Sequence, residues 1–311
     1  MQRILDQDEV ARLLSWEELL LAMEKALQEF STGRVVQPVR TLLSLNGAGW
    51  FGVMPCAYRE AIGAKLVTVF PENAGRDVPT HQAVILLFSP DTGEPLCVMD
   101  GALITARRTA AVSALATREL SRPDSEVLAI LGSGVQARTH FHALGMVRQF
   151  KEVRVWSRTA ANAERFAAEI RARVMPIEKA VRDADVVVTV TNAAQPIVDG
   201  NWLKPGVHIN AVGSVGPVAR ELDDTALRSA VVVVESRPAA ERESAEIVQS
   251  GVRIYAELGE ILAGLKPKPL GGNTLYKSLG IAVEDVAAAY LVYRKAAGSL
   301  QRPAEGGRGP V

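Results

Sequence analysis

Short apolar runs alternate with helical patterns along the second half of the chain. The run 127–131 (Val-Leu-Ala-Ile-Leu) is apolar throughout, which is typical of a strand buried on both faces of a parallel sheet. Further strands are predicted at 153–157, 185–190, 208–212 and 230–235, with helices between several of them. Strands that alternate with helices favour a doubly wound α/β sheet, here ending near Lys277.

The pattern before this region is different. The segment 15–18 (Ser-Trp-Glu-Glu) is a capping box before an amphipathic helix that runs to about residue 30. Short β-rich runs, separated by Gly, Pro and Asn, predict an antiparallel sheet from 41–45, 50–54, 64–70, 82–88 and 96–99. Helices are predicted over about 105–120 and 280–297. The last helix can pack back on this first unit, which would make the parallel sheet an insertion.

A glycine-rich turn directly follows the first apolar strand. Gly132 and Gly134, with Ala137 at the third small position, fit a G-x-G-x-x-G/A dinucleotide fingerprint, and a purely structural turn is the alternative. Phosphates would meet the free N–H groups at the start of the next helix. The residues predicted to line this part of the site are Gly132, Gly134, Val135, Gln136 and Ala137. We expect an α/β fold: a Rossmann-type doubly wound parallel sheet (121–277) inserted into a second α+β domain (1–120 plus 278–311).

The end of the second parallel strand indicates which dinucleotide is bound. An NAD site carries Asp or Glu about 20 residues beyond the glycines. This chain has Ser157, Arg158 and Thr159 there instead. Arg158 can bind a 2′-phosphate, with Ser157, Thr159 and Asn162 as further donors, although it could also be a solvated residue at a strand end. The sequence predicts NADPH, and NADH remains possible.

Composition favours an enzyme of small molecules. Lys plus Arg and Asp plus Glu number 35 each among 311 residues, so no charge excess points to nucleic acid or to a membrane surface. No apolar run approaches the roughly 20 residues of a spanning helix, and the N-terminus is unlike a signal peptide. Two cysteines and four histidines show no metal-ligand spacing, so no metal is expected. We expect a cytoplasmic protein.

Two adjacent arginines point to an anionic partner. Arg107 and Arg108 follow Thr105, a good N-cap residue, and are therefore predicted to lie in the first turn of a helix. The helix macrodipole disfavours positive charge there by about 0.3–1 kcal/mol, so we expect an anion nearby.

Two further cations belong to the first unit. Arg40 precedes a predicted strand, and Lys65 shares one face of a strand with Val67 and Val69, which is unusual for an ammonium group without a partner. Each of these cations taken alone could be a surface or ion-pair residue. Taken together, they predict a carboxylate-binding pocket beside the nicotinamide.

Eight short motifs are spread along nearly the whole chain: Gln37–Thr41, Gly52–Pro55, Ala64–Thr68, His81–Ala83, Met99–Gly101, Ile104–Ala111, Asn210–Gly213 and Lys277–Gly280. Together they resemble the ornithine cyclodeaminase/mu-crystallin family, and most closely its mu-crystallin (ketimine reductase) branch.

This resemblance implies a homodimer in which the first and last segments form a substrate-binding and dimerisation domain around the Rossmann domain. It implies that Arg40, Lys65 and Arg108 hold the carboxylate of an imino or keto acid substrate. It also implies that the cofactor side is lined by Thr80, His81, Gln82, Arg158, Thr159, Asn162, Thr191, Val212 and Ser278.

Two positions depart from the cyclodeaminase pattern. Gly52 stands where cyclodeaminases resembling this chain have Glu, and Val215 stands where they and the family's alanine dehydrogenases have Asp. Neither residue accepts a proton or pairs with an ammonium group. The resemblance therefore favours a ketimine reductase. The alternatives are a cyclodeaminase or alanine dehydrogenase-like enzyme and a non-catalytic binding protein for a small ligand such as thyroid hormone.

The expected reaction is hydride transfer from NADPH to the C=N carbon of a cyclic ketimine carboxylate or related α-imino acid. Arg40, Arg108 and Lys65 would fix the carboxylate. Lys65 is the predicted proton donor, with its pKa lowered by the two arginines, and water is an equal alternative. This hypothesis expects the three cations to converge with no acidic side chain beside them.

Overall fold

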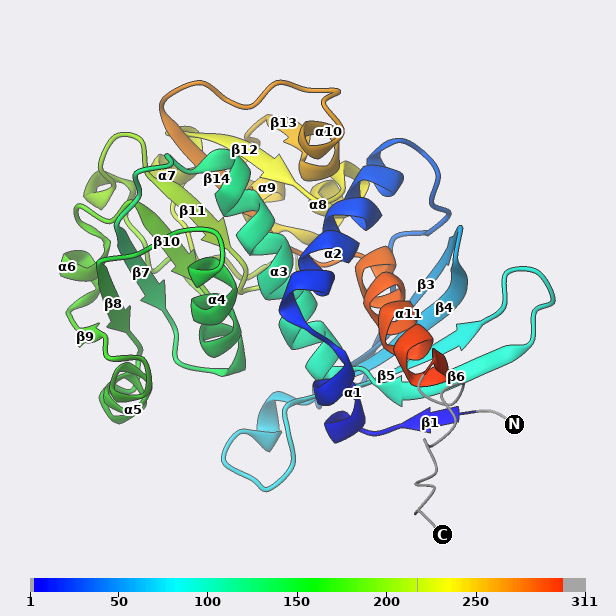
Figure 1. Cartoon of the computed structure of the whole chain (residues 1–311). Helices are drawn as coiled ribbons and strands as arrows, with labels where there is room; N and C mark the ends of the chain where they lie inside the picture. The colour runs from blue at the N-terminus through cyan, green and yellow to red at the C-terminus, as the bar shows by residue number, and fades with distance from the viewer. Residues whose placement is uncertain (1–2, 217, 299–311) are drawn as a thin grey trace, which may run out of the picture.

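The computed structural model describes residues 3–216 and 218–298, so the end of the first predicted domain (299–311) lies outside the described residues. Two sheets form the framework (Figure 1). The first has the order β1-β6-β5-β4-β3-β2, and all neighbours are antiparallel except β1 and β6. Its strands are β1 (Arg3–Leu5), β2 (Thr41–Ser44), β3 (Trp50–Tyr58), β4 (Ala61–Val69), β5 (His81–Phe88) and β6 (Pro95–Asp100).

The second sheet is entirely parallel, with the order β13-β12-β14-β11-β10-β7-β8-β9. Its strands are β7 (Val127–Leu131), β8 (Glu152–Trp156), β9 (Arg173–Val174), β10 (Val186–Thr189), β11 (His208–Ala211), β12 (Ala230–Val234), β13 (Ile254–Glu257) and β14 (Asn273–Lys277). The Rossmann-type α/β fold is confirmed. Sequence patterns missed β9, β13 and β14, the last of which lies between β11 and β12 in the sheet.

Helices cover both faces of the second sheet and one face of the first (Figure 1). They are α1 (Gln7–Leu13), α2 (Trp16–Ser31), α3 (Ala102–Leu120), α4 (Val135–Gly145), α5 (Ala160–Ile170), α6 (Ile177–Val181), α7 (Asp224–Arg228), α8 (Arg237–Glu243), α9 (Ala245–Ser250), α10 (Leu258–Leu262) and α11 (Ala282–Gly298). None of the helices in the described part of the chain is long and apolar enough to cross a membrane.

Helix α3 lies between the two sheets and belongs to both cores. Ala111, Val112 and Leu115 pack with the first sheet, whereas Ala110 and Ala114 pack with the second. The helix contacts α2, α4 and α11. Residues fixed on α3 are therefore held rigidly at the boundary between the sheets.

The predicted start of α3 is wrong by almost a turn. The helix begins at Ala102 after Gly101, because the carboxylate of Asp100 accepts a hydrogen bond from the N–H of Leu103 and starts the helix earlier than Thr105. The arginines at 107 and 108 consequently lie in the second turn, and the macrodipole argument for an anion beside them does not hold. Arg107 donates instead to the carbonyls of Ala11 and Leu14, away from Arg108.

The capping box predicted before α2 does not form. The helix begins at Trp16 as expected, but the Ser15 hydroxyl donates to the Glu18 carboxylate rather than accepting a backbone N–H. A capping box forms one helix earlier, between Asp6 and Glu9 at the start of α1.

The two faces of the first sheet differ in burial. The paired residues Met54, Lys65, Ile85 and Met99 form a row across the inner face, where α3 and α11 cover it, and all four are buried. The opposite face carries apolar side chains that stay accessible, among them Leu43, Ile62 and Val84 at 53%, 38% and 43% exposure.

Candidate active site

The turn between β7 and α4 has the geometry that phosphate binding needs. Gly132 has φ +132°, and a Cβ there would lie 2.7 Å from the carbonyl oxygen of Val190, so a larger residue does not fit. Gly134 precedes the first residue of α4, and no atom lies within 4 Å of where its Cβ would be. Ala137 is fully buried against the sheet. The turn thus offers an open helix N-terminus that fits the pyrophosphate of a dinucleotide.

Val135 and Gln136 form the first turn of α4. Val135 is 66% exposed. The side-chain oxygen of Gln136 is buried without a hydrogen-bond partner among the described residues.

The end of β8 lies beside this turn, because the N–H of Gly132 donates to the carbonyl of Trp156 at 2.8 Å. The hydroxyls of Ser133 and Ser157 are 2.9 Å apart. Arg158 is exposed, and no hydrogen bond or ion pair engages its guanidinium within the described ranges. The neighbouring predicted donors Thr159 and Asn162 are also exposed. The predicted 2′-phosphate residues are therefore together and accessible.

Thr191 and Val212 follow the carboxyl ends of β10 and β11, next to the glycine turn in the sheet order. The buried carboxylate of Glu221 accepts hydrogen bonds from the N–H and hydroxyl of Thr191 at 2.7 Å and 2.6 Å, and from the N–H of Gly213 at 2.9 Å. Burial raises the pKa of Glu221, against the opposing charge of Lys277. Glu221 thus fixes the two loops that follow β10 and β11.

Thr80, His81 and Gln82 lie at the start of β5. The Thr80 hydroxyl is 3.3 Å from Nδ1 of His81, and the side chains of His81 and Gln82 are exposed. No hydrogen bond joins these three residues to the glycine turn in the described structure.

Lys65 and Arg108 meet on one carboxylate. The Nζ of Lys65 lies 2.8 Å from Oδ2 of Asp285, and Nε of Arg108 lies 3.0 Å from Oδ1 of the same residue. Arg108 also donates through Nη1 to Glu284 at 2.6 Å, and Lys65 lies 3.4 Å from the hydroxyl of Thr105. All four charged side chains are buried.

Arg40 reaches the same place from the segment before β2. Its Nη2 donates to the carbonyls of Leu279 and Gly280 at 2.8 Å each, and its Nε donates to Glu243 at 2.9 Å. Gly280 has φ +73°, and a Cβ there would lie 2.1 Å from Nη1 of Arg108. The segment 279–280 therefore lies between Arg40 and Arg108, and Lys65 is joined to Arg108 through the carboxylate of Asp285.

Glu235, at the end of β12, holds this segment in place. Its buried carboxylate accepts hydrogen bonds from the N–H groups of Leu279 and Gly280 at 2.9 Å and 3.2 Å. It also accepts the hydroxyls of Tyr276 and Ser278 at 2.5 Å and 3.0 Å. Ser278, predicted on the cofactor side, is thus buried on Glu235.

The expectation that no acid lies beside the cations is wrong. Asp285 and Glu284 pair with Lys65 and Arg108, and Glu243 pairs with Arg40. These acids are hard to recognise from the sequence, because acidic residues in the first turn of a helix are ordinary: they complement the macrodipole. The one unusual feature is the side-by-side placement of Glu284 and Asp285 in an otherwise apolar, alanine-rich segment.

Burial controls the charges of this cluster. It lowers the pKa of Lys65 to about 8; the charge of Asp285 opposes this shift and that of Arg108 adds to it. Desolvation, rather than the two arginines, is therefore the main cause. Burial also raises the pKa of Glu284 to about 8, against the charge of Arg108. It would raise that of Asp285 too, but Arg108 and Lys65 hold the pKa of Asp285 below its ordinary value.

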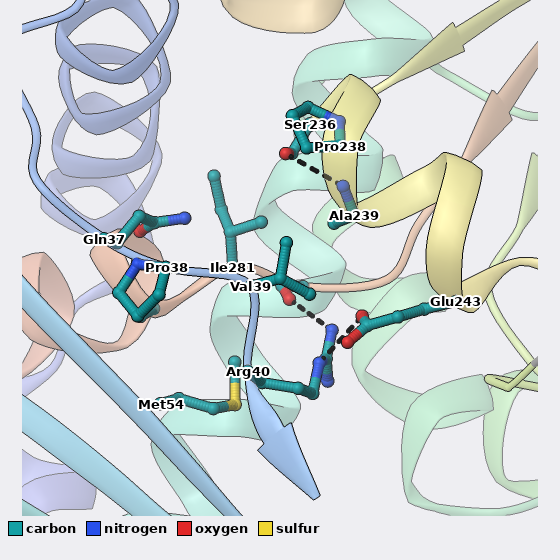
Figure 2. A pocket seen from close by; sticks show the side chains of 12 residues that line it. Gln37, Pro38, Val39, Arg40, Met54, Ser236, Pro238, Ala239, Glu243 and Ile281 are labelled. Carbon is teal, nitrogen blue, oxygen red and sulfur yellow. Dashed lines mark hydrogen bonds and ion pairs between the residues drawn. The ribbon is translucent and has the colours of Figure 1, made fainter.

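A small pocket opens beside Arg40, between the first sheet and α8 (Figure 2). Its walls are Gln37, Pro38, Val39, Arg40, Met54, Ser236, Pro238, Ala239, Glu243, Gly280, Ile281 and Ala282. Apart from the Arg40–Glu243 ion pair, the lining is largely apolar. Gly52 is buried on the same face of β3 as Met54, and Val215 is 46% exposed. Neither side chain carries a carboxylate.

A Rossmann-type parallel sheet with an open glycine turn, joined to a second sheet that carries a cluster of paired cations, has the framework of a nucleotide-binding α/β protein. Residues 1–299 match the ornithine cyclodeaminase/mu-crystallin family, and the chain belongs to this family.

Three known proteins illustrate the similarity. The ketimine reductase mu-crystallin of Rattus norvegicus is 49% identical over 299 residues, 93% of this chain and 96% of the relative. The structure of Thermococcus litoralis Delta(1)-pyrroline-2-carboxylate reductase in complex with NADH and L-proline has a TM-score of 0.92, 36% identity, and coverage of 96% and 98% of the two chains. An archaeal alanine dehydrogenase dimer with bound NAD also has a TM-score of 0.92, at 34% identity, covering 96% and 97%.

Proposed function

We propose that this protein is an NADPH-dependent oxidoreductase that reduces the C=N bond of cyclic ketimine carboxylates or related α-imino acids to amino acids. Its relatives include a ketimine reductase and a pyrroline-2-carboxylate reductase that align over nearly the whole chain. The observation that carries the proposal is that Arg40 and Arg108 both contact the segment 279–280, beside a largely apolar pocket, while Lys65 shares the carboxylate of Asp285 with Arg108.

The substrate carboxylate binds to the guanidinium groups of Arg40 and Arg108, whose planar donors fix its orientation. NADPH supplies the hydride when it is bound at the glycine turn. Lys65 gives a proton to the imine nitrogen. A lysine whose pKa is about 8 is largely protonated at neutral pH and is a much better acid than an ordinary lysine. Asp285 keeps both Lys65 and Arg108 in place.

A lyase needs a group that accepts protons from the substrate amine and pairs with it. Cyclodeaminase-like chemistry would draw on carboxylates at positions 52 and 215, where this chain has Gly52 and Val215. The carboxylates that do lie in the site, Asp285, Glu284 and Glu243, are each engaged with a cation. This arrangement favours reduction over deamination.

NADPH is the preferred cofactor in this proposal. Arg158 offers an exposed guanidinium next to the phosphate-binding turn, where an NAD site has an acidic side chain. NADH, the cofactor in the Thermococcus complex, can occupy the same turn because the pyrophosphate contacts are shared.

The proposed assembly is a homodimer. We assign residues 1–120 with 278–311 to a substrate and dimerisation domain and 121–277 to a cofactor domain. The exposed apolar side chains on the outer face of the first sheet give a second copy a surface to cover. A dimer is also the form of the similar alanine dehydrogenase.

A reducing compartment, the cytoplasm, is the proposed location. Cys56 and Cys97 are both buried free thiols. Unpaired cysteines are typical of proteins that stay in reducing surroundings.

The test is direct. Purified protein is mixed with NADPH or NADH and with five- or six-membered cyclic ketimine carboxylates, and oxidation of the cofactor is followed by absorbance. We expect rapid oxidation of NADPH with at least one ring size. Ornithine and alanine with the oxidised cofactors are the controls for a lyase or an amino-acid dehydrogenase. If the protein turns over ornithine or alanine and reduces none of the ketimines, the proposal is overturned.

A further inference from the structure

Glu243 occupies the side of Arg40 that a carboxylate ligand needs. The Nε of Arg40 donates to Glu243 at 2.9 Å (Figure 2). Its Nη2 donates to the carbonyls of Leu279 and Gly280. Those bonds use the Nε hydrogen and both hydrogens of Nη2. Only the two hydrogens of Nη1 remain, so a substrate carboxylate can accept the Nε hydrogen only if Glu243 gives it up.

The pair also spans the two sheets. Arg40 belongs to the segment leading into β2 of the first sheet, whereas Glu243 ends α8, which follows β12 of the second. Both side chains line the pocket, and they are only 9% and 8% exposed. The contact therefore lies in the wall of the pocket between the first sheet and α8.

We propose that Glu243 occupies the position of the substrate carboxylate on Arg40 and is displaced from it when substrate binds. Glu243 is then a positioning residue: it keeps the guanidinium aimed into the pocket and sets the affinity for carboxylates by competing with them. This inference rests on the proposed function only in that Arg40 binds the substrate carboxylate.

The exchange has a measurable consequence in protons. The charged groups facing Glu243 are Arg40, Arg242 on its own helix, and Glu235 at the end of β12. Burial already raises the pKa of Glu243, and Arg40 is the main charge that opposes the rise. Once Arg40 turns to the substrate, a buried carboxylate without its partner and with Glu235 nearby is costly, so Glu243 takes up a proton.

Calorimetry with an unreactive planar ligand measures both effects. Pyrrole-2-carboxylate is titrated into the protein with bound NADP⁺, in two buffers of different ionisation enthalpy. For the native chain we expect proton uptake on binding. In the Glu243→Gln variant, which keeps the shape and removes the charge, we expect uptake to vanish and the dissociation constant to fall about fivefold or more. Weaker or unchanged binding by this variant, or uptake that persists in it, would overturn the proposal.

Two controls isolate the exchange. Glu241→Gln removes the same charge from an exposed position on the same helix and should change neither uptake nor affinity. Pyrrole-2-carboxamide lacks the carboxylate and should gain nothing from Glu243→Gln. A native protein that binds the carboxylate without proton uptake contradicts the proposal even before any variant is made.

These measurements involve no turnover, so the two proposals fail separately. If the exchange is observed but no ketimine is reduced, Glu243 still regulates a carboxylate site and the reductase assignment falls. If ketimines are reduced but the exchange is absent, the Glu243–Arg40 ion pair only stabilises the contact between the two sheets, and this inference is wrong.

Discussion

A lysine that is buried on the inner face of a sheet must either pair with an acidic side chain or lose its proton. Lys65 keeps an ion pair with Asp285 while burial lowers its pKa to about 8. The same carboxylate holds Arg108, so one side chain of α11 fixes two of the three proposed substrate contacts. Replacing either partner of such a pair leaves a buried unpaired charge, which is expected to be costly.

The proton-donor role of Lys65 predicts a specific pH dependence. Below pH about 8 the ammonium form is present and can give its proton to the imine; above it the neutral amine cannot, so kcat should fall as pH rises through this value. Lys65→Met should lower kcat at neutral pH by about a hundredfold or more and leave NADPH affinity unchanged. Steady-state kinetics from pH 6 to about 10 check this. If water is the donor, Lys65→Met retains most of its turnover and the native pH profile.

Arg158 predicts cofactor preference. Arg158→Ala removes a charge-assisted contact with the 2′-phosphate, so KM for NADPH should rise about tenfold or more while KM for NADH stays unchanged. The control is Arg165→Ala, which removes an exposed arginine from α5. An equal effect on both cofactors would place Arg158 outside the 2′-phosphate site.

At the scale of elements, the apolar patterns located most strands to within one or two residues. They gave β7 at 127–131, and β8, β10, β11 and β12 close to their observed bounds. They missed β14, because Thr274 and Lys277 make it look like a polar strand although both are buried. Its polar side chains are satisfied from outside the strand: Lys277 donates to the carbonyl of Gly213, and Thr274 to that of Leu120. Pairing of this kind comes from tertiary structure and leaves no local pattern.

The candidate site was predictable to the same extent. Three cations in different elements could be named because their positions were unusual for charges, and the structure brings them together. Their partners Glu284 and Asp285 could not be recognised, since the first turn of a helix is an ordinary place for acids. The distinction between an acid that caps a helix and one that pairs with a buried lysine depends on how α11 packs on β4.

The start of α11 offers a sharp test at the scale of this element. Gly280 has φ +73°, and a Cβ there would strike Arg108, with Nη1 at 2.1 Å. Gly280→Ala should displace the guanidinium and raise KM for the carboxylate substrate about tenfold or more, with NADPH affinity retained. The matched control is Gly264→Ala, which has the same φ of +73° and no atom within 4 Å of the new Cβ. It carries the backbone strain, about 1 kcal/mol, without the clash.

If both alanine variants lose thermal stability equally and neither changes KM, the clash with Arg108 is relieved without moving the site. Thermal unfolding and substrate kinetics on the two variants separate these outcomes.

At the scale of the whole molecule, the two sheets are joined by α3 and by side chains that cross between them, such as Arg40. The inner face of the first sheet is covered by α3 and α11, which carry residues of the candidate site. Its outer face is left with apolar side chains in contact with solvent. A long apolar sheet face exposed in this way is a site for association or aggregation unless another surface covers it.

The homodimer proposal therefore predicts where association can be broken. Val84 lies near the middle of the outer face, paired with Leu66 on β4 and Asp100 on β6, and is 43% exposed. Val84→Lys should give a folded monomer, because an ammonium group in the centre of an apolar interface loses hydration that one ion pair with the neighbouring Asp100 does not repay. Sedimentation velocity measures the mass and circular dichroism the fold. Leu270→Lys, at a side chain that is 97% exposed in a loop, should stay dimeric. A native protein that sediments as a monomer, or a Val84→Lys variant that remains a dimer, would place the interface elsewhere or remove it.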